Sequence, residues 1–351
     1  MKTVMILGAG VSRAARSVGA MSKRPPLDTD FFEIARTGKH ILRGNVIDTL
    51  HALVGDYSHS LIRSLETSAT YLYLKAVDSP SGSSYHSGFL DLLTLLSQVL
   101  AVTTNDLKLG RRSLLYRFIL CELQKLEAPQ DLTIITFNYD LVIENAIQEI
   151  ASNSRPNVFC FPGCYRLEDY VSSPGPRGHP QFTSISVEFE GVAVLKLHGS
   201  MSWQSKHTSD RPRPSALFHP NREINIVNSR HIVPSLRWRP GTRMVYLKPI
   251  IVPPISGKRN MMHSSMQKLW DMSASKLEEA DRIIIAGYSC PPLDLEARIL
   301  LSENLRKNNS KKIYVIDPNH ASAAKFVELC GVSHATIYSS ISEWVADDVA
   351  I

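Results

Sequence analysis

A short glycine-rich segment directly after an apolar run constrains the fold of this chain most. Residues Val4–Leu7 are apolar, and Gly8-Ala9-Gly10-Val11-Ser12 follows them at once. In α/β proteins, a strand followed by Gly-x-Gly and a helix start often holds a diphosphate, because glycines let backbone N–H groups approach the phosphates. The third glycine of the usual motif is missing, since Arg13 stands in its place. The segment alone leaves two interpretations open, a diphosphate site and a plain strand-to-helix turn.

Short apolar runs rich in Val and Ile recur along the chain, with helical patterns between them. This alternation predicts an α/β fold with a Rossmann-like, mostly parallel sheet, in a single domain over residues 1–351. The expected strands are Val4–Leu7, Leu132–Thr136, Ala193–Leu197, Pro249–Val252, Arg282–Ala286, Lys312–Ile316 and Thr336–Tyr338. The expected helices between them are Asp140–Ala151, Leu293–Arg306 and Ala321–Leu329.

Two stretches interrupt this alternation. Residues 31 to about 130 hold no clear strand, so we expect a helical insertion between the first and second strands, with helices at Phe89–Val102 and Arg112–Leu126. The second stretch covers 152–190 and 202–245 and is rich in Pro, Ser and Arg. It predicts irregular structure over about 202–245, with short antiparallel strands near Thr183–Phe189.

The composition is that of a soluble globular protein, with 44% apolar and 21% charged residues. No apolar stretch reaches the ~20 residues that span a bilayer, and the N-terminus reads as a core strand instead of a cleavable signal. We therefore expect a cytoplasmic protein without a membrane segment.

Cysteines give no sign of a disulfide framework, because their number is odd, five, and they are scattered. Only Cys160 and Cys164 lie close together, with His179 nearby. A structural zinc site usually needs four ligands in paired spacings, so we expect no metal.

Basic residues are in excess, with a net charge of +6, and many of them fall within 206–259. The basic residues of this stretch are Lys206, Arg211, Arg213, Arg222, Arg230, Arg237, Arg239, Arg243, Lys248, Lys258 and Arg259. They form either an anion- or nucleic-acid-binding surface or, as we favour, a solvated face or one that meets an acidic partner. No aromatic-interleaved nucleic-acid motif accompanies them.

Polar residues follow five of the expected strands. In an open α/β sheet, ligands bind beyond the carboxyl ends of the strands, so these residues are the candidates for a site. Besides the first turn, they are Asn138, Asp140, His198, Gly287, Ser289 and Asp317. Each also has a structural interpretation: Asn138, Asp140 or Ser289 as a helix cap, His198 as a satisfied buried histidine, and Asp317 as a turn former before Pro318.

The segments GAGVS, TFNYD, LKLHGS, AGYS and VIDPN together resemble the SIR2-like family, specifically the bacterial branch found in antiphage defence. The segment RPPLDTDFF at Arg24–Phe32 also resembles a segment of that branch. The resemblance covers about 1–35, 130–145, 192–203 and 249–320. It implies a Rossmann-like domain that binds NAD+ as its substrate.

The resemblance also implies roles for individual residues. Asn138 and His198 match the catalytic pair of the family. Cofactor-binding positions are implied at Gly8, Ala9, Gly10 and Ser12 near the diphosphate and a ribose, at Asp30, Phe31 and Asp140, and at Gly287, Ser289 and Asp317 near the adenosine.

The implied activity is that of an NAD+ glycohydrolase, which cleaves NAD+ to nicotinamide and ADP-ribose and depletes NAD+ during abortive infection. Deacylating sirtuins carry a four-cysteine zinc module that this chain lacks, which favours water as the acceptor. Three alternatives stay open: an NAD-dependent protein deacylase, a non-catalytic subunit that senses NAD+ or ADP-ribose, and a nuclease subunit of a defence complex.

Control of such an activity implies an assembly. By analogy with the family, we expect a homo-oligomer, a partner such as a HerA-like ATPase, or both. The insertion offers apolar helix faces, such as Phe89, Leu92, Leu93, Leu96 and Leu100, that are either core or interface.

Overall fold

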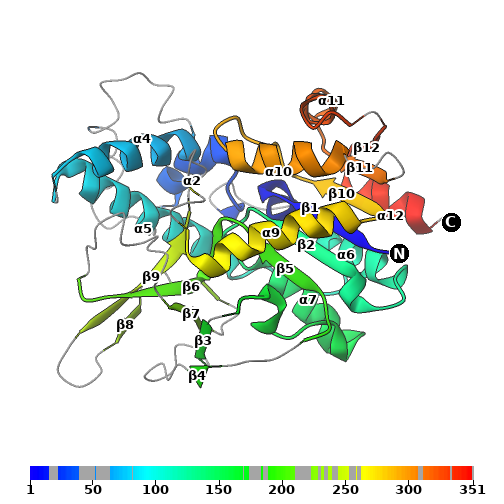
Figure 1. Ribbon diagram of the computed structural model, residues 1–351, viewed down its shortest axis with the longest axis horizontal. Helices are drawn as coiled ribbons and strands as arrows, with labels where there is room; N and C mark the ends of the chain where they lie inside the picture. The colour runs from blue at the N-terminus through cyan, green and yellow to red at the C-terminus, as the bar shows by residue number, and fades with distance from the viewer. Residues whose placement is uncertain are drawn as a thin grey trace.

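The computed structural model describes most of the chain. The described residues are 1–15, 23–38, 52, 64–80, 82–168, 170–173, 183–184, 189–209, 223–227, 231–232, 236–238, 244–252, 258, 262–306, 311–332 and 334–349. Within them, the chain forms two six-stranded sheets and a set of helices (Figure 1).

The first sheet, sheet A, is parallel throughout, with the strand order β12-β11-β10-β1-β2-β5. Its strands are β1 (Thr3–Leu7), β2 (Leu132–Thr136), β5 (Ala193–Lys196), β10 (Arg282–Ala286), β11 (Lys312–Ile316) and β12 (Thr336–Tyr338). Every residue of β1, β2, β5 and β10 is buried, as expected when helices cover both faces of a parallel sheet. The predicted Rossmann-like α/β fold is confirmed.

The strand order contains a topological switch point. From β1, the chain builds outward to β2 and β5 on one side, and it then returns to build β10, β11 and β12 on the other side. In doubly wound sheets of this order, the crevice for ligands opens at the carboxyl ends of the strands where the direction reverses. Here that point lies between β1 and β10.

Between β1 and β2, the described residues form helices joined by turns and loops and include no strand, as predicted for the insertion. The segment contains η2 (Asp28–Asp30), α2 (Phe31–Thr37), α4 (Leu65–Asp78), α5 (Ser84–Thr104), α6 (Leu114–Gln124) and η5 (Pro129–Asp131). The other helices are α1 (Ala9–Ala14), α7 (Val142–Asn153), α9 (Ser264–Glu279), α10 (Leu295–Arg306), α11 (His320–Leu329) and α12 (Ile341–Val349), with short η6 (Pro156–Val158) and η7 (Gly163–Tyr165).

Helix α5 shows how the insertion is specified. The hydroxyl of Ser83 caps its first turn by accepting from the His86 N–H at 3.2 Å. Phe89, Leu92 and Leu96 are at most 4% exposed, so their face packs into the core. By length and composition, α5 could cross a membrane, contrary to the expectation that no apolar stretch is long enough, but 67% of its most apolar stretch is buried inside the fold.

The second sheet, sheet B, has the order β4-β3-β7-β6-β9-β8 and is antiparallel except between β3 and β7. Its strands are β3 (Tyr170–Ser173), β4 (Thr183–Ser184), β6 (Gly199–His207), β7 (Ile224–Val227), β8 (Leu236–Trp238) and β9 (Val245–Ile251). The stretch 202–245, expected to be irregular, thus carries strands. The expected parallel strand Pro249–Val252 is wrong, because these residues end β9, which pairs antiparallel with β6 and β8.

The reason for this difference lies in β6. Its residues Ser200, Ser202 and Gln204 are polar yet at most 3% exposed, so both faces of the strand are buried. Polar and apolar residues do alternate over Ser200-Met201-Ser202-Trp203-Gln204, but this run is short and lies in a stretch rich in Pro, Ser and Arg, which favoured irregular structure.

Figure 1 shows how these parts surround sheet A. The N-terminus, where β1 begins, lies to the right, and β1 runs toward the left of the view. Helices α4 and α5 and sheet B lie on that left side, above and below. Helices α4 and α5 of the insertion and sheet B therefore both lie toward the carboxyl edge of sheet A, whereas α6 lies on the right, near α7 and α12.

Candidate functional site

The register of sheet A brings the strand-end motifs to one edge. Leu7 of β1 pairs with Thr136 of β2 and Ala286 of β10, and Thr136 pairs with Lys196 of β5. Asn138 and His198 therefore each lie two residues beyond a matched pair on adjacent strands. The turns after β1 and β10 lie next along the same edge, as the sequence analysis expected.

The glycine-rich turn after β1 packs directly on the turn after β10. Gly8 N donates to Ala286 O and Gly10 N donates to Gly287 O, both at 3.0 Å. A Cβ on Gly8 would lie 2.3 Å from Gly287 O, and one on Gly10 would lie 2.7 Å from the Gly287 Cα. Gly287 itself has φ +60. These glycines are thus required by contact between the two turns, which places β1 and β10 together at the switch point.

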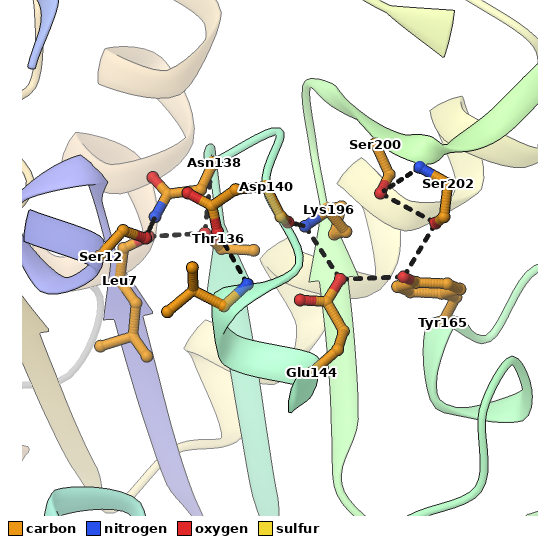
Figure 2. A network of polar contacts seen from close by, with 11 residues as sticks. Leu7, Ser12, Thr136, Asn138, Asp140, Glu144, Tyr165, Lys196, Ser200 and Ser202 are labelled. Atoms are coloured by element: carbon orange, nitrogen blue, oxygen red, sulfur yellow. Dashed lines mark hydrogen bonds and ion pairs between the residues drawn. The ribbon is translucent and has the colours of Figure 1, made fainter. Parts of the chain in front are cut away.

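Asn138 is held by neutral groups of the first turn (Figure 2). Its Nδ2 donates to Gly8 O at 3.0 Å and to Ser12 Oγ at 3.1 Å, and its backbone N donates to Thr136 Oγ1 at 3.1 Å. Thr136 Oγ1 in turn donates to Leu7 O at 2.7 Å. Since a carbonyl can only accept, the contact with Gly8 fixes the orientation of the amide. Oδ1 of Asn138 is the group left to accept from a ligand or water.

Asp140 lies two residues before helix α7 and beside the same cluster. Its Oδ1 accepts from the backbone N of Val142, the first residue of α7, at 2.9 Å, although the N-cap residue of the helix is Leu141. Burial raises the pKa of Asp140, while Lys196 and hydrogen bonds from Val142 and Ser12 oppose the rise. Figure 2 shows Lys196 reaching the Asp140 carbonyl, at 2.6 Å, and pairing with Glu144 at 2.9 Å. The Asp140 turn is therefore anchored from β5 as well as from β1.

His198 lies where the chain passes from sheet A into sheet B. Its carbonyl accepts from Val252 N at 2.9 Å, and Gly199, the next residue, begins β6 with φ +84. A Cβ at Gly199 would lie 2.1 Å from Ile250 O, which explains the glycine in the His-Gly pair. The ring is 4% exposed and packs edge-on against Phe137 at a centroid distance of 5.1 Å.

Two charged residues that the sequence analysis did not select contact the His198 ring. Lys258 Nζ lies 2.8 Å from Nε2, and Asp294 Oδ2 lies 2.9 Å from the same nitrogen. Lys258 also pairs directly with Asp294, and both are fully buried. We call His198, Lys258 and Asp294 the charged cluster. The favoured interpretation of the basic stretch, a solvated face or one that meets an acidic partner, is wrong for Lys258, because this side chain is buried.

Each member of the charged cluster has a shifted pKa. Burial lowers the pKa of His198, and Lys258 lowers it further, while Asp294 opposes both effects. Burial also lowers the pKa of Lys258, against the attraction of Asp294. Burial alone would raise the pKa of Asp294, but His198 and Lys258 outweigh it and hold that pKa well below its usual range. The resting cluster is therefore a lysine–aspartate ion pair beside a neutral imidazole.

The insertion adds Glu66, which was also missed. Its backbone N donates to Asp28 Oδ1 at 2.7 Å, its side chain is 7% exposed, and Oε1 has no hydrogen-bond partner among the described residues. Burial raises the pKa of Glu66 to about 8, and Asp28 and Asp294 add to the rise while Lys258 opposes it. Because it responds to Asp294 and Lys258, Glu66 lies on the His198 side of the edge.

The remaining predicted positions make structural contacts. Asp30 accepts from Leu27 N at 2.8 Å and pairs with Arg13. Phe31 is fully buried, with its ring edge-on to Phe32. Ser289 is exposed, and Asp317 accepts from Asn319 N at 2.7 Å in the turn before α11. The turn-forming interpretation of Asp317 accounts for this contact.

Metal ligands do not gather among the described residues, where no group of three or more His, Cys, Asp or Glu could hold an ion. Cys160 and Cys164 are free, and burial raises the pKa of Cys164 well above its usual value. A buried thiol of this kind is not poised to bind zinc as a thiolate. His179 lies outside the described residues.

A hollow of about 480 Å³ opens at the opposite edge of sheet A, beside the strand starts at Thr3, Thr133 and Ala193. None of the strand-end residues lines it. We place the candidate site at the carboxyl edge instead, because the convergent polar groups and the shifted pKa values are there.

Comparisons with known proteins give no family assignment. Scans against protein-family models and against curated proteins find no match. Among solved structures, similar folds include a mutant Sir2 homologue with 2′-O-acetyl ADP ribose (TM-score 0.42, 16% identity, covering 99% of this chain and 90% of that one). A second is a Sir2 homolog–NAD complex (TM-score 0.39, 15% identity, covering 99% of this chain and 88% of that one). A third is Sir2Tm bound to a propionylated peptide (TM-score 0.37, 12% identity, covering 99% of this chain and 91% of that one). At such TM-scores, the similarity carries no argument about ligand or reaction.

Proposed function

We propose that this chain is an NAD+ glycohydrolase, which hydrolyses NAD+ to nicotinamide and ADP-ribose. The observation that carries the proposal is that Asn138 and His198 follow the ends of two adjacent strands, beside the glycine-rich turn at the switch point. This arrangement offers a hydrogen-bond acceptor and a neutral imidazole where a doubly wound sheet binds nucleotides. The sequence motifs that resemble the SIR2-like family supply the same two residues.

The chemistry of the bond accounts for these groups. As the bond between ribose C1′ and nicotinamide breaks, its electron pair goes to the ring nitrogen, and C1′ gains oxocarbenium character. Water forms the new bond to C1′ and loses one proton, so the products are nicotinamide, ADP-ribose and H+. Nicotinamide leaves as a neutral molecule and needs no strong acid. Asn138 Oδ1 can accept from the water or a ribose hydroxyl, and neutral His198 can take the proton.

The test is to incubate the purified protein with NAD+ and to separate the products. Nicotinamide and ADP-ribose in equal amounts are expected, with no zinc detected by elemental analysis. Adding an acetyl-lysine peptide distinguishes the deacylase alternative, which would form O-acetyl-ADP-ribose. Binding of NAD+ without turnover would instead favour a sensing subunit.

The cellular role is part of the proposal and rests on the family resemblance. We propose that the protein depletes NAD+ during phage infection, as an assembly of several copies or with a partner such as a HerA-like ATPase. Light scattering tests the assembly against the 39.2 kDa mass of one chain. Plaque counts with the wild type and Asn138→Ala test the defence role, and equal counts would contradict it.

A further inference from the structure

The charged cluster places two competing partners on one nitrogen of His198. Asp294 Oδ2 at 2.9 Å can accept a proton from Nε2, whereas Lys258 Nζ at 2.8 Å can donate one to it. In the first case Nε2 carries the hydrogen and Nδ1 is the basic nitrogen. In the second case Nδ1 carries the hydrogen and cannot act as a base. The partner that prevails therefore decides which chemistry the ring can perform.

The hydrogen-bond partners of the Asp294 carboxylate favour the tautomer of His198 with its hydrogen on Nε2. Oδ1 of this buried carboxylate pairs with Lys258, and the Ala297 N–H is a long contact at 3.4 Å. Oδ2 has the His198 ring at 2.9 Å and the Tyr288 hydroxyl at 3.4 Å. If Nε2 carried no hydrogen, its lone pair would face the charged Oδ2, and the carboxylate would lose its short contact there. Loss of the one short donor to Oδ2 weakens the solvation of a buried charge, whereas the Lys258 ammonium keeps Asp294 Oδ1 as its partner in either case.

Other titratable groups around the ring do not change this balance. Glu296, on α10, raises the pKa of His198 and also accepts from the Lys258 backbone N at 3.1 Å. Tyr139 and Tyr288 stay neutral, because burial raises their pKa values well above the usual one.

From the insertion, Glu66 and Asp28 face the same region and act on Tyr139. Glu66 also raises the pKa of Lys258, against the effect of burial. Neither residue is among the groups that shift the pKa of His198.

We propose that Asp294 and Lys258 are positioning residues for His198: Asp294 holds the ring through Nε2–H and leaves Nδ1 as the basic nitrogen, and Lys258 keeps Asp294 ionised and the ring neutral. The proposal rests on the proposed function only for the use of Nδ1, which would take the proton that the attacking water loses. The arrangement itself is a property of the resting protein. It resembles the general logic in which a carboxylate orients a histidine base.

The two positioning residues have opposite electrostatic effects, and this makes the proposal testable. Lys258→Met removes a charge that lowers the pKa of His198, so that pKa rises. Asp294→Asn removes a charge that raises it, so the pKa falls. If neutral His198 is the base, the acid limb of the pH–rate profile moves up in the first variant and down in the second, each on the order of one pH unit. A merely structural role would lower the rate of both variants without moving the limb in opposite directions.

The deciding measurement is NMR titration of the His198 ring in protein labelled at histidine, with the signal assigned through His198→Gln. We expect the wild-type ring to be neutral at pH 7 with its hydrogen on Nε2, and the two variants to shift its pKa in opposite directions. Lys311→Met is the matched control. It removes another buried lysine, which donates to Leu277 O at 2.7 Å away from the site, and it should leave the His198 titration unchanged.

A hydrogen on Nδ1 in the wild type, or shifts of the same sign in both variants, would overturn the proposal. Asp294→Asn leaves Lys258 without its counter-charge and can fail to fold. In that event, the tautomer of His198 in the wild type and the change of its pKa in Lys258→Met are sufficient to test the proposal. Because the NMR readout needs no turnover, a protein that does not hydrolyse NAD+ would refute the proposed function while leaving this inference to its own test.

Discussion

The ends of β2 and β5 lie side by side, yet they place their key residues in opposite surroundings. After β2, Asn138 is held by a carbonyl and two hydroxyls, all neutral. After β5, His198 is held by a buried lysine–aspartate pair. We call the end of β2 the neutral side and the end of β5 the charged side. The neutral side holds Asn138 in an orientation that does not depend on pH, whereas the charges beside His198 influence which nitrogen of its ring carries a hydrogen. In the proposed reaction, orienting the nucleophile and taking its proton would thus be divided between two strands.

The largest effect should come from removing either key side chain. We expect His198→Ala and Asn138→Ala each to lower NAD+ hydrolysis by about 10²–10⁴-fold, as is typical for an acid–base group. Product formation is measured by chromatography. His207→Ala and Asn225→Ala remove a buried histidine and a buried asparagine of sheet B and are the matched controls. A near-normal rate for either site variant would mean that its strand end is not part of the reaction.

Glu66 should make stability depend on pH on the charged side. Its pKa is about 8 in the folded protein against 4.5 for the free side chain. The unfolded chain therefore loses its proton first, and the folded state loses stability as pH rises from about 4.5 to 8. Glu66→Gln stays neutral, so its stability relative to wild type should increase across that window, by about 2–4 kcal/mol.

Urea unfolding at pH 5 and pH 9 measures this difference. Glu168→Gln, at an exposed glutamate, is the control and should show no such trend. A Glu66→Gln variant with the same advantage at both pH values would show that the Glu66 carboxyl is not held neutral by burial.

Gly10→Val tests the contact between the turns after β1 and β10. A side chain there meets the Gly287 backbone at 2.7 Å, and we expect a loss of about 1–3 kcal/mol in stability together with weaker binding of ADP-ribose. Thermal unfolding and calorimetry measure the two effects. Gly110→Ala is the control, since a Cβ there meets nothing within 4 Å. Unchanged affinity in a folded Gly10→Val variant would place the diphosphate elsewhere.

The smallest effect is expected at Thr136, which supports Asn138. Thr136→Val removes both the bond to Leu7 O and the acceptor for Asn138 N. We expect a loss of about 0.5–1.5 kcal/mol in stability, a reduced rate and an unshifted pH profile. Thr136→Ser keeps the hydroxyl and should behave as wild type. A shift of the pH–rate profile in Thr136→Val would contradict the view that the end of β2 has no influence on the protonation of His198.

The neutral side could be predicted from sequence because its residues belong to contiguous motifs at strand ends. Val4–Leu7 and Leu132–Thr136 are uniformly buried strands rich in Val, Ile and Leu, and a parallel sheet necessarily gathers the residues that follow them. What the sequence could not show is that Gly8 and Gly10 are needed for contact with Gly287. A glycine in the sequence indicates that another group can approach the backbone closely, but it does not show whether that group is a ligand or another turn of the protein.

The charged side was largely hidden. Asp294 follows β10 closely in the segment Pro291-Pro292-Leu293-Asp294, so an acid after a strand end was the one available signal. Lys258 is one of many basic residues in its stretch, and Glu66 lies in the first turn of a surface-like helical pattern. Burial of such charges is decided by tertiary contacts, and neither periodicity nor composition reports those contacts.

The wide spacing of the charged cluster along the chain has a consequence for biosynthesis. Lys258 follows His198 by 60 residues, and Asp294 follows Lys258 by 36. Chains fold from the N-terminal side as they are made. Asn138, the glycine-rich turn and His198 are therefore synthesised before Lys258 and Asp294, the two residues that contact the His198 ring. The complete charged cluster can therefore form only after Asp294 has been added to the growing chain.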